Sequence, residues 1–243
     1  MTDPADVHDE VPAAWRILLA LDALLLIGVA VVVQLLNGEV IPPLVVLPVL
    51  FGVGLVLLVV RPRPGAIAVG VLAVLMTLAN LAHLVPDLGH PESFWSFLTS
   101  AVAVVGSIVG AVALVAVLRR TDGGAAPYLG VVGGVVLIAL VAFSAVATSG
   151  RANDTRQEGD QGMFAQDLEF KPDAFTASAG EIGIFIGNDD LIRHNFSIDE
   201  LDVDVELPSK AFVRIEFEAE AGTYVYYCDI EGHEDMRGTL TVE

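Results

Sequence analysis

Three side chains near the C-terminus combine metal-binding chemistries within nine residues: Cys228, His233 and Met236. Cys228 is the only cysteine, so it has no disulfide partner within the chain. Thiolate and thioether sulfur stabilise Cu(I) and imidazole suits Cu(II), so this mixture favours copper. A trigonal copper site for electron transfer needs two His, one Cys and a weak axial Met. The C-x4-H-x2-M spacing supplies three of these four ligands.

The fourth ligand is expected upstream, and His194 in the stretch 193–198 is the candidate. The alternative is that Cys228 only fills a core, as free cysteine often does, but four potential ligands in the right order weigh against it. Zinc accepts nitrogen and sulfur, yet it gains little from the thioether of Met236. A binuclear copper centre would need a second cysteine between Cys228 and His233, where the sequence is Asp-Ile-Glu-Gly. The predicted site is therefore mononuclear.

Several short stretches of the last third of the chain share one pattern: Phe170-Lys171-Pro172, Ala179-Gly180, Gly187-Asn188-Asp189, His194-Asn195-Phe196-Ser197, Gly222-Thr223-Tyr224, Tyr227-Cys228, Gly232-His233 and Gly238-Thr239-Leu240. They resemble the cupredoxins, the small blue-copper proteins of the plastocyanin and halocyanin type. The resemblance implies a Greek-key sandwich that holds one copper ion, cycling between Cu(I) and Cu(II). It implies His194, Cys228 and His233 as equatorial ligands. Met236 would be the axial ligand, and Asn195 would tie the two ligand loops together.

The first 150 residues differ in composition from the rest. Apolar residues reach 54% of the whole chain, and its mean hydropathy is +0.67. After an acidic tail, residues 1–13, which lacks the basic start of a secretory signal, five apolar runs are each near the length that spans a bilayer core of ~30 Å. The predicted transmembrane helices are residues 14–36, 43–60, 65–84, 94–118 and 128–147. Runs almost without charge are not expected in buried helices of a soluble protein.

Basic residues in the short loops predict the orientation, because such loops stay in the cytoplasm. The loops 61–64 and 119–126 each carry two Arg, whereas the loops 37–43 and 85–93 carry neither Lys nor Arg. The N-terminus is therefore expected in the cytoplasm. This predicts a multi-pass protein of the cell membrane, in contact with lipid, with its copper domain on the extracytoplasmic side.

Asp22 lies within the first predicted helix. Ionisable residues inside a membrane are functional candidates, but we favour a structural interpretation, in which Asp22 lies at interfacial depth or is protonated against a neighbour. Gly106-x3-Gly110 and Gly130-x3-Gly134 have the spacing of close helix packing. No pair of helix histidines suggests a haem.

The predicted outer loop 82–92 carries His83, His90 and two carboxylates. One hypothesis is a second metal site or a place where copper enters. The other is an interfacial loop with ordinary polar residues, which we favour because a seven-residue His spacing matches no fixed metal geometry.

Residues 148–165 are polar and lack apolar periodicity, which predicts a flexible linker. From residue 166 onward, short alternating or β-branched segments predict a small antiparallel sandwich. The predicted strands are 181–186, 195–198, 211–217 and 223–227. The fold class is thus mixed: an all-α bundle of five transmembrane helices, residues 14–147, and an all-β cupredoxin-like domain, residues 166–243.

The predicted copper domain is strongly acidic. Residues 166–243 contain 19 Asp and Glu against five Lys and Arg, a balance of −14. This charge disfavours nucleic acid and attracts basic redox partner proteins, although general adaptation to high salt would look the same. We expect an electron carrier, not an enzyme, with His233 as its most exposed ligand. The alternatives are a copper-handling protein (chaperone, store or sensor) and, more remotely, a bundle that carries an activity of its own.

Overall fold

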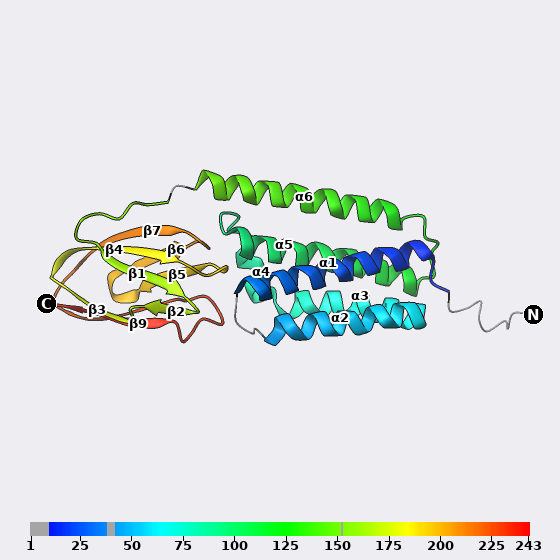
Figure 1. Ribbon diagram of the computed structural model, residues 1–243, viewed down its shortest axis with the longest axis horizontal. Helices are drawn as coiled ribbons and strands as arrows, with labels where there is room; N and C mark the ends of the chain where they lie inside the picture. Colours follow the sequence, from blue (N-terminus) through cyan, green and yellow to red (C-terminus); the bar gives the residue numbers. More distant parts are fainter. Residues whose placement is uncertain (1–9, 38–41, 152) are drawn as a thin grey trace, which may run out of the picture. The chain divides into compact units, whose positions relative to one another are not determined.

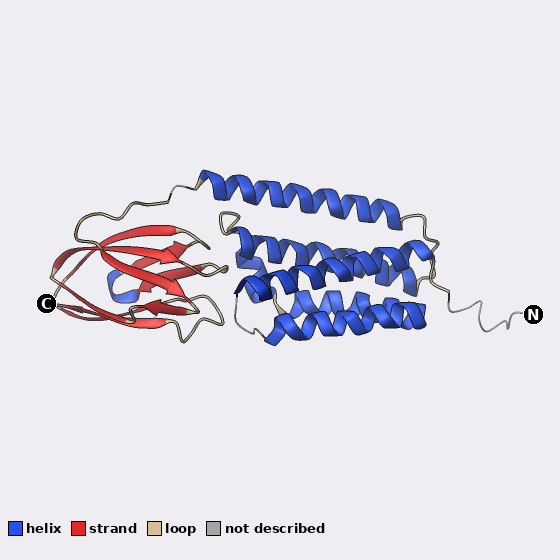
Figure 2. Cartoon of the chain, viewed as in Figure 1, coloured by secondary structure: helices blue, strands red, loops and turns tan. Residues whose placement is uncertain are grey.

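The computed structural model describes residues 10–37, 42–151 and 153–243. They form two compact units: a helical unit of residues up to 88 with 98–143, and a mainly β unit of 89–97 with 144–243 (Figures 1 and 2). The first nine residues of the predicted acidic tail lie outside the described residues.

Six helices occur in the described residues: α1 (Ala13–Asn37), α2 (Pro42–Val60), α3 (Pro62–Ala79), α4 (Leu81–Asp87), α5 (Phe94–Leu118) and α6 (Ala126–Gly150). All except α4 are long and apolar enough to cross a membrane. This confirms the five predicted spans, although several boundaries move. The apolar side chains on the outside of the helices remain exposed, which suits contact with lipid.

The third predicted helix, 65–84, is divided in two by Asn80. The side-chain amide of Asn80 donates to the Met76 carbonyl at 2.7 Å, while its backbone N–H turns to Thr77. Asparagine competes in this way for helix carbonyl groups, so α3 ends and α4 begins. His83 consequently lies on α4, and the predicted outer loop is partly helical. At its other end α3 starts earlier than predicted, because proline is tolerated in a first turn.

Glycines let the helices of the bundle approach closely at some of the predicted positions. A Cβ added to Gly110 of α5 would lie 2.8 Å from the Cβ of Ala73 in α3. One added to Gly130 of α6 would lie 3.2 Å from Leu18 of α1. Gly134, by contrast, has nothing within 4 Å of its added Cβ. The second glycine pair is therefore only half used for packing.

The β unit is a two-layer sandwich. Its strands are β1 (Gln161–Gln166), β2 (Glu169–Lys171), β3 (Ala174–Ala177), β4 (Gly180–Asn188), β5 (His194–Ile198), β6 (Val203–Leu207), β7 (Phe212–Ala219), β8 (Gly222–Tyr227) and β9 (Arg237–Val242). One sheet has the order β2-β1-β4-β7 and the other β3-β9-β8-β5-β6. Most strand pairs are antiparallel, as predicted, but β1 pairs parallel with β4, and β3 parallel with β9.

The predicted linker boundary at residue 166 is also wrong, because β1 already begins at Gln161. Upstream of it, the side chains of Asn153 and Asp154 accept hydrogen bonds from the backbone N–H groups of Phe212 and Arg214 at 3.2 and 2.8 Å. These N–H groups lie on the free side of the edge strand β7. The polar residues that suggested a flexible tether instead cover a sheet edge.

Three aromatic rings join the two sheets near the end that carries the predicted ligands. Phe170 meets Phe196 and Tyr226 edge to face at centroid distances of 5.7 and 5.4 Å. Phe196 and Tyr226 stack at 5.2 Å. All three are fully buried. They fix β5, which begins with His194, against β8, which ends directly before Cys228.

Candidate metal centre

The predicted ligands come from two neighbouring strands and one short loop. β5 opens with His194, and β8 ends at Tyr227, directly before Cys228. The strands pair at Ser197 and Tyr227, so their ends lie together. The loop after β8 folds back, since the Cys228 backbone N–H donates to the Met236 carbonyl at 2.9 Å.

Within this loop the backbone of Met236 donates to the carbonyl of His233 at 2.8 Å, and that of His233 to Ile230 at 3.0 Å. Gly232 adopts a φ of 87°, which favours glycine in the left-handed region. Two tight turns therefore bring His233 back beside Cys228.

Three donor atoms converge on one point. Nδ1 of His194 lies 3.2 Å from Nδ1 of His233, and the Cys228 sulfur lies 4.0 and 3.4 Å from these two nitrogens. Around a metal bound to nitrogen at about 2.0 Å and sulfur at about 2.3 Å, such donors stand roughly 3.3–3.8 Å apart. Among the described residues, this is the only group of three or more His, Cys, Asp or Glu side chains placed closely enough to hold a metal ion. The sequence prediction of this trio agrees with the fold.

Burial differs among the four predicted ligands. His194, Met236 and Cys228 are 0%, 1% and 3% exposed, whereas His233 is half-buried. The expectation that His233 is the most exposed is confirmed. Met236 belongs to the same apolar core as Cys228.

A carboxylate orients the buried histidine. Nε2 of His194 lies 2.9 Å from Oδ2 of Asp190, whose side chain is 11% exposed. Burial opposes the charge on Asp190, but hydrogen bonds from His194 and from the backbone of Asp167 and Leu168 outweigh it, so the pKa of the carboxyl lies below its usual value. His194 then donates through Nε2 and keeps Nδ1 free as a ligand. Asp190 is not among the site residues predicted from the sequence, although a carboxylate four residues before a predicted ligand could have signalled it.

Asn195 ties the two ligand segments together, as the resemblance implied. Its side-chain oxygen accepts from the backbone of Asp229 at 2.8 Å, and its amide donates to the Asp229 carboxylate at 2.7 Å. The amide also reaches Asp204 at 2.9 Å. Because Asn195 follows His194 and Asp229 follows Cys228, these bonds fix the spacing of two ligands.

Burial raises the pKa of the Cys228 thiol. Hydrogen bonds from the backbone N–H groups of Asn195 and Ile230 favour the thiolate, but their effect on the pKa is smaller than that of burial. Without a metal the thiol is therefore weakly reactive. A bound metal ion supplies the positive charge that a buried thiolate needs.

A segment distant in the sequence supports the His194 strand. Ser96 accepts a hydrogen bond from the backbone of Arg193 at 3.1 Å, and Ser93 accepts one from Ser209 at 3.2 Å; both serines are fully buried. The nearby His90 ring pairs with Glu92 at 3.0 Å. Ser93 and Ser96 were not predicted to support the site, because no local sequence pattern marks them.

The donor set fits one copper ion. Two imidazoles, one thiolate and one thioether are the combination of a type 1 site, and the three atoms that converge have suitable separations. The buried surroundings keep water away, while one histidine edge reaches the surface.

The C-terminal part of the chain matches one family of known proteins. Residues 135–242 match the family model described as a cupredoxin-like domain. A search of curated proteins finds no match. Among solved structures, the chain is similar to a Cu(I)-bound amicyanin variant, with 20% identity and a TM-score of 0.30, covering 36% of this chain and 86% of that one.

It is also similar to a plastocyanin of fern (22% identity, TM-score 0.29, 34% of this chain and 99% of that chain). A third similar structure is a copper-containing nitrite reductase from Thermus scotoductus, with 18% identity and a TM-score of 0.31. The similar region covers 39% of this chain and only 24% of the enzyme. The match of residues 135–242 and the sandwich that bears the ligands identify the C-terminal part of the chain as a cupredoxin-like domain behind a helical region.

Proposed function

We propose that the protein is a mononuclear type 1 copper protein that carries single electrons at the extracytoplasmic face of the membrane. The observation that carries this proposal is the convergence of His194, His233 and Cys228 within 4.0 Å, with His194 oriented by Asp190. Copper bound there would supply a one-electron couple between Cu(I) and Cu(II).

The protein's own residues would keep the structural change between the Cu(I) and Cu(II) states small. His194 is held by Asp190 and by its place in β5, and the Cys228 segment is held by Asn195. A scaffold fixed in this way resists rearrangement, which favours fast electron exchange. The half-buried ring of His233 offers the exposed edge at which an electron enters or leaves.

Loop charges support the proposed orientation. Arg61 lies between α2 and α3, Arg63 lies in the first turn of α3, and Arg119 and Arg120 directly follow α5. An odd number of spans, five, then leaves the termini on opposite sides. With the N-terminus in the cytoplasm, the cupredoxin-like domain faces outward.

The surface around the ligand loop supports a basic redox protein as partner. Four exposed carboxylates surround His233: Asp229, Glu231, Glu234 and Asp235. Such a field accelerates encounter with a cationic protein, and the rate falls as salt rises. Glu231→Gln with Asp235→Asn should flatten this salt dependence. Glu218→Gln with Glu220→Gln is the matched control, because these exposed residues adjoin the turn that begins β8, at the end away from Cys228.

The test is visible absorption of the full chain in detergent during titration with Cu(II), then with a reductant. The expected result is an intense blue band that saturates at one copper per chain, bleaches and returns reversibly, and disappears in Cys228→Ser. His90→Gln removes an imidazole outside the site and should leave the band intact. A colourless complex, or one that releases copper on reduction, would overturn electron transfer in favour of copper handling.

A further inference from the structure

Asp22 is a buried carboxyl within the helical unit. It is the tenth residue of α1, roughly 14 Å along the helix from its start. Only 7% of the residue is exposed, and its Oδ2 has no hydrogen-bond partner within the described residues. An unpaired buried polar atom is costly and calls for an explanation. The copper site does not use this residue.

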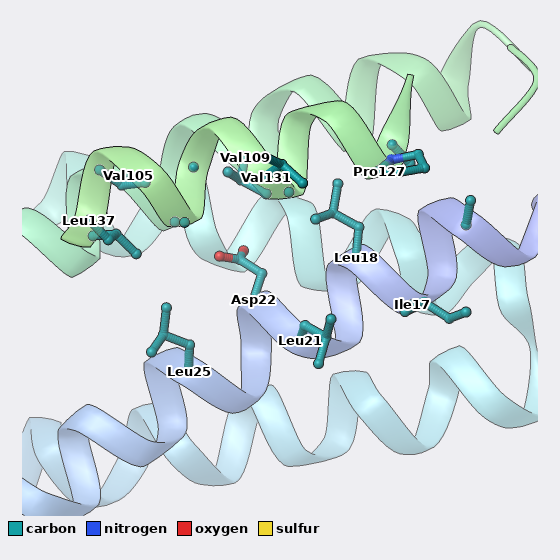
Figure 3. Close-up of a pocket in the computed structure, with 16 residues that line it drawn as sticks. Ile17, Leu18, Leu21, Asp22, Leu25, Val105, Val109, Pro127, Val131 and Leu137 are labelled. Carbon is teal, nitrogen blue, oxygen red and sulfur yellow. The ribbon is translucent and has the colours of Figure 1, made fainter. Parts of the chain in front are cut away.

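The carboxyl points into a cavity between α1, α5 and α6 (Figure 3). The cavity has a volume of about 500 Å³, within the usual range of small-molecule sites. Asp22 is the only ionisable residue in its lining; the others are apolar side chains, Gly and Pro. Gly106 on α5 makes room for the carboxyl, since a Cβ there would lie 2.9 Å from Oδ1 of Asp22. Gly106, one of the two glycines in the predicted Gly106-x3-Gly110 pair, therefore accommodates the Asp22 carboxyl as well as close helix packing.

The cavity opens on the outer surface of the helical unit. Its lining includes Ile17, Leu21 and Leu25 of α1 and Val131 of α6, all of which are exposed, by 39% to 65%. In a membrane these apolar side chains face lipid. A ligand would therefore enter from the bilayer rather than from water.

The lining restricts the chemistry of the ligand. Most of its body must be apolar, because Asp22 is the only ionisable group present. An anionic head group would meet a carboxyl and no basic residue. A hydroxyl group both donates and accepts, so it can pair with Asp22 whether the carboxyl is ionised or protonated.

We propose that this cavity binds a membrane-soluble, neutral amphiphile whose hydroxyl group pairs with Asp22. The hydroxyl belongs either to a quinol-type ring or to a long aliphatic alcohol. The proposal is independent of copper, so its failure would leave the proposed electron carrier untouched.

The test uses the full chain in phosphatidylcholine nanodiscs with two photoreactive probes, a decyl hydroquinone kept reduced and a dodecanol. We expect saturable labelling of peptides from α1, α5 and α6, competed by the unlabelled compound. Asp22→Ala should weaken apparent affinity by about two- to tenfold, the loss expected for a hydrogen bond whose carboxyl partner is neutral, and by more if the carboxyl is ionised. Asp22→Asn, which keeps a donor and an acceptor, should retain most of the binding. The probe that saturates at lower concentration identifies the source of the hydroxyl.

A pair of glycines provides a matched control. An added Cβ meets nothing within 4 Å at either Gly134 or Gly28, but only Gly134 lines the cavity. Gly134→Leu should therefore block labelling, and Gly28→Leu should not. Labelling that never saturates, that survives Asp22→Ala and Gly134→Leu, or that responds equally to both leucine variants would overturn the proposal. Unchanged melting of each variant excludes misfolding as the cause.

Discussion

Asp190 and His194 form a 2.9 Å contact that determines which nitrogen of the imidazole faces Cys228. With Nε2 directed at the carboxylate, Nδ1 lies 4.0 Å from the sulfur and 3.2 Å from Nδ1 of His233. Asp190 also accepts from the backbone of Asp167 at 2.9 Å, so the ring is attached to the turn between β1 and β2. The ligand's orientation thus depends on a neighbouring sheet.

Replacing this carboxylate should make the copper site easier to reduce. Asp190→Asn preserves shape but removes a negative charge that favours Cu(II) through the His194 ring. Loss of such an outer contact typically weakens metal binding by about 10–100-fold. If only Cu(II) is affected, each tenfold raises the reduction potential by about 59 mV. Redox titration of the blue band measures this shift.

Asp189→Asn is the matched control for that experiment. It removes the same charge one residue away, on an exposed side chain. We expect a much smaller change in potential. Equal shifts in the two variants would mean that the general field, and not the contact with His194, sets the potential.

Asn195 should control how firmly the site retains copper. Asn195→Ala breaks the tie to Asp229 and leaves a backbone N–H without its acceptor, a loss of about 1–3 kcal/mol. Transfer of copper to a chelator should become several-fold faster. Asn153→Ala also removes an acceptor of a backbone N–H, from Phe212, but lies outside the site. If both variants release copper at the same rate, Asn195 has only a general role in stability.

The sequence was sufficient to predict the five spans and the meeting of His194, Cys228 and His233, because each has a strong local or chemical signal. Cys228 and His233 lie in one short loop, and long apolar runs leave little choice of structure. Asp190 and Ser96 escaped prediction because their roles depend on contacts that only the folded chain creates. Asn80 was overlooked because its side chain competes for a carbonyl inside an otherwise uniform apolar run. The strand β1 was overlooked because its pairing with β4 is parallel and its residues, 161–166, are mostly polar or small.

Gly238 should tolerate no side chain. A Cβ at this position would lie 2.3 Å from the Tyr226 ring and hydroxyl and 2.4 Å from the carbonyl of Asp173. Gly238→Ala should therefore destabilise the domain by about 1–3 kcal/mol or more through overpacking. The temperature at which the blue colour is lost measures the effect. Gly222→Ala, whose nearest contact would be an ordinary 3.4 Å, should melt close to the unmodified protein; equal melting of both alanine variants would contradict the steric argument.

The ion pair between Asp160 and Arg214 should give the domain a measurable dependence on acid. Asp160 is 5% exposed, and its carboxylate lies 3.0 Å from Nε of Arg214. Hydrogen bonds from Arg214 and from the backbone of Gln157 hold the pKa of Asp160 below its usual value of 3.8. A depressed pKa in the folded state contributes stability above the unfolded value. That stability is lost as pH falls through the folded value.

Asp160→Asn should accordingly speed hydrogen exchange in peptides of β4 and β7 several-fold at pH 7. The difference from the unmodified protein should shrink as pH falls below about 3.8 and disappear once Asp160 is protonated in the folded state, below its lowered pKa. Glu220 is an exposed carboxylate directly after β7, and its replacement in Glu220→Gln should have no such effect on hydrogen exchange. The faster exchange should be concentrated in the edge strand β7, because Arg214 of this strand also donates its backbone N–H to Asp154 at 2.8 Å. A difference between variant and unmodified protein that stays constant from pH 7 to strongly acidic conditions would show that Asp160 acts through shape rather than charge.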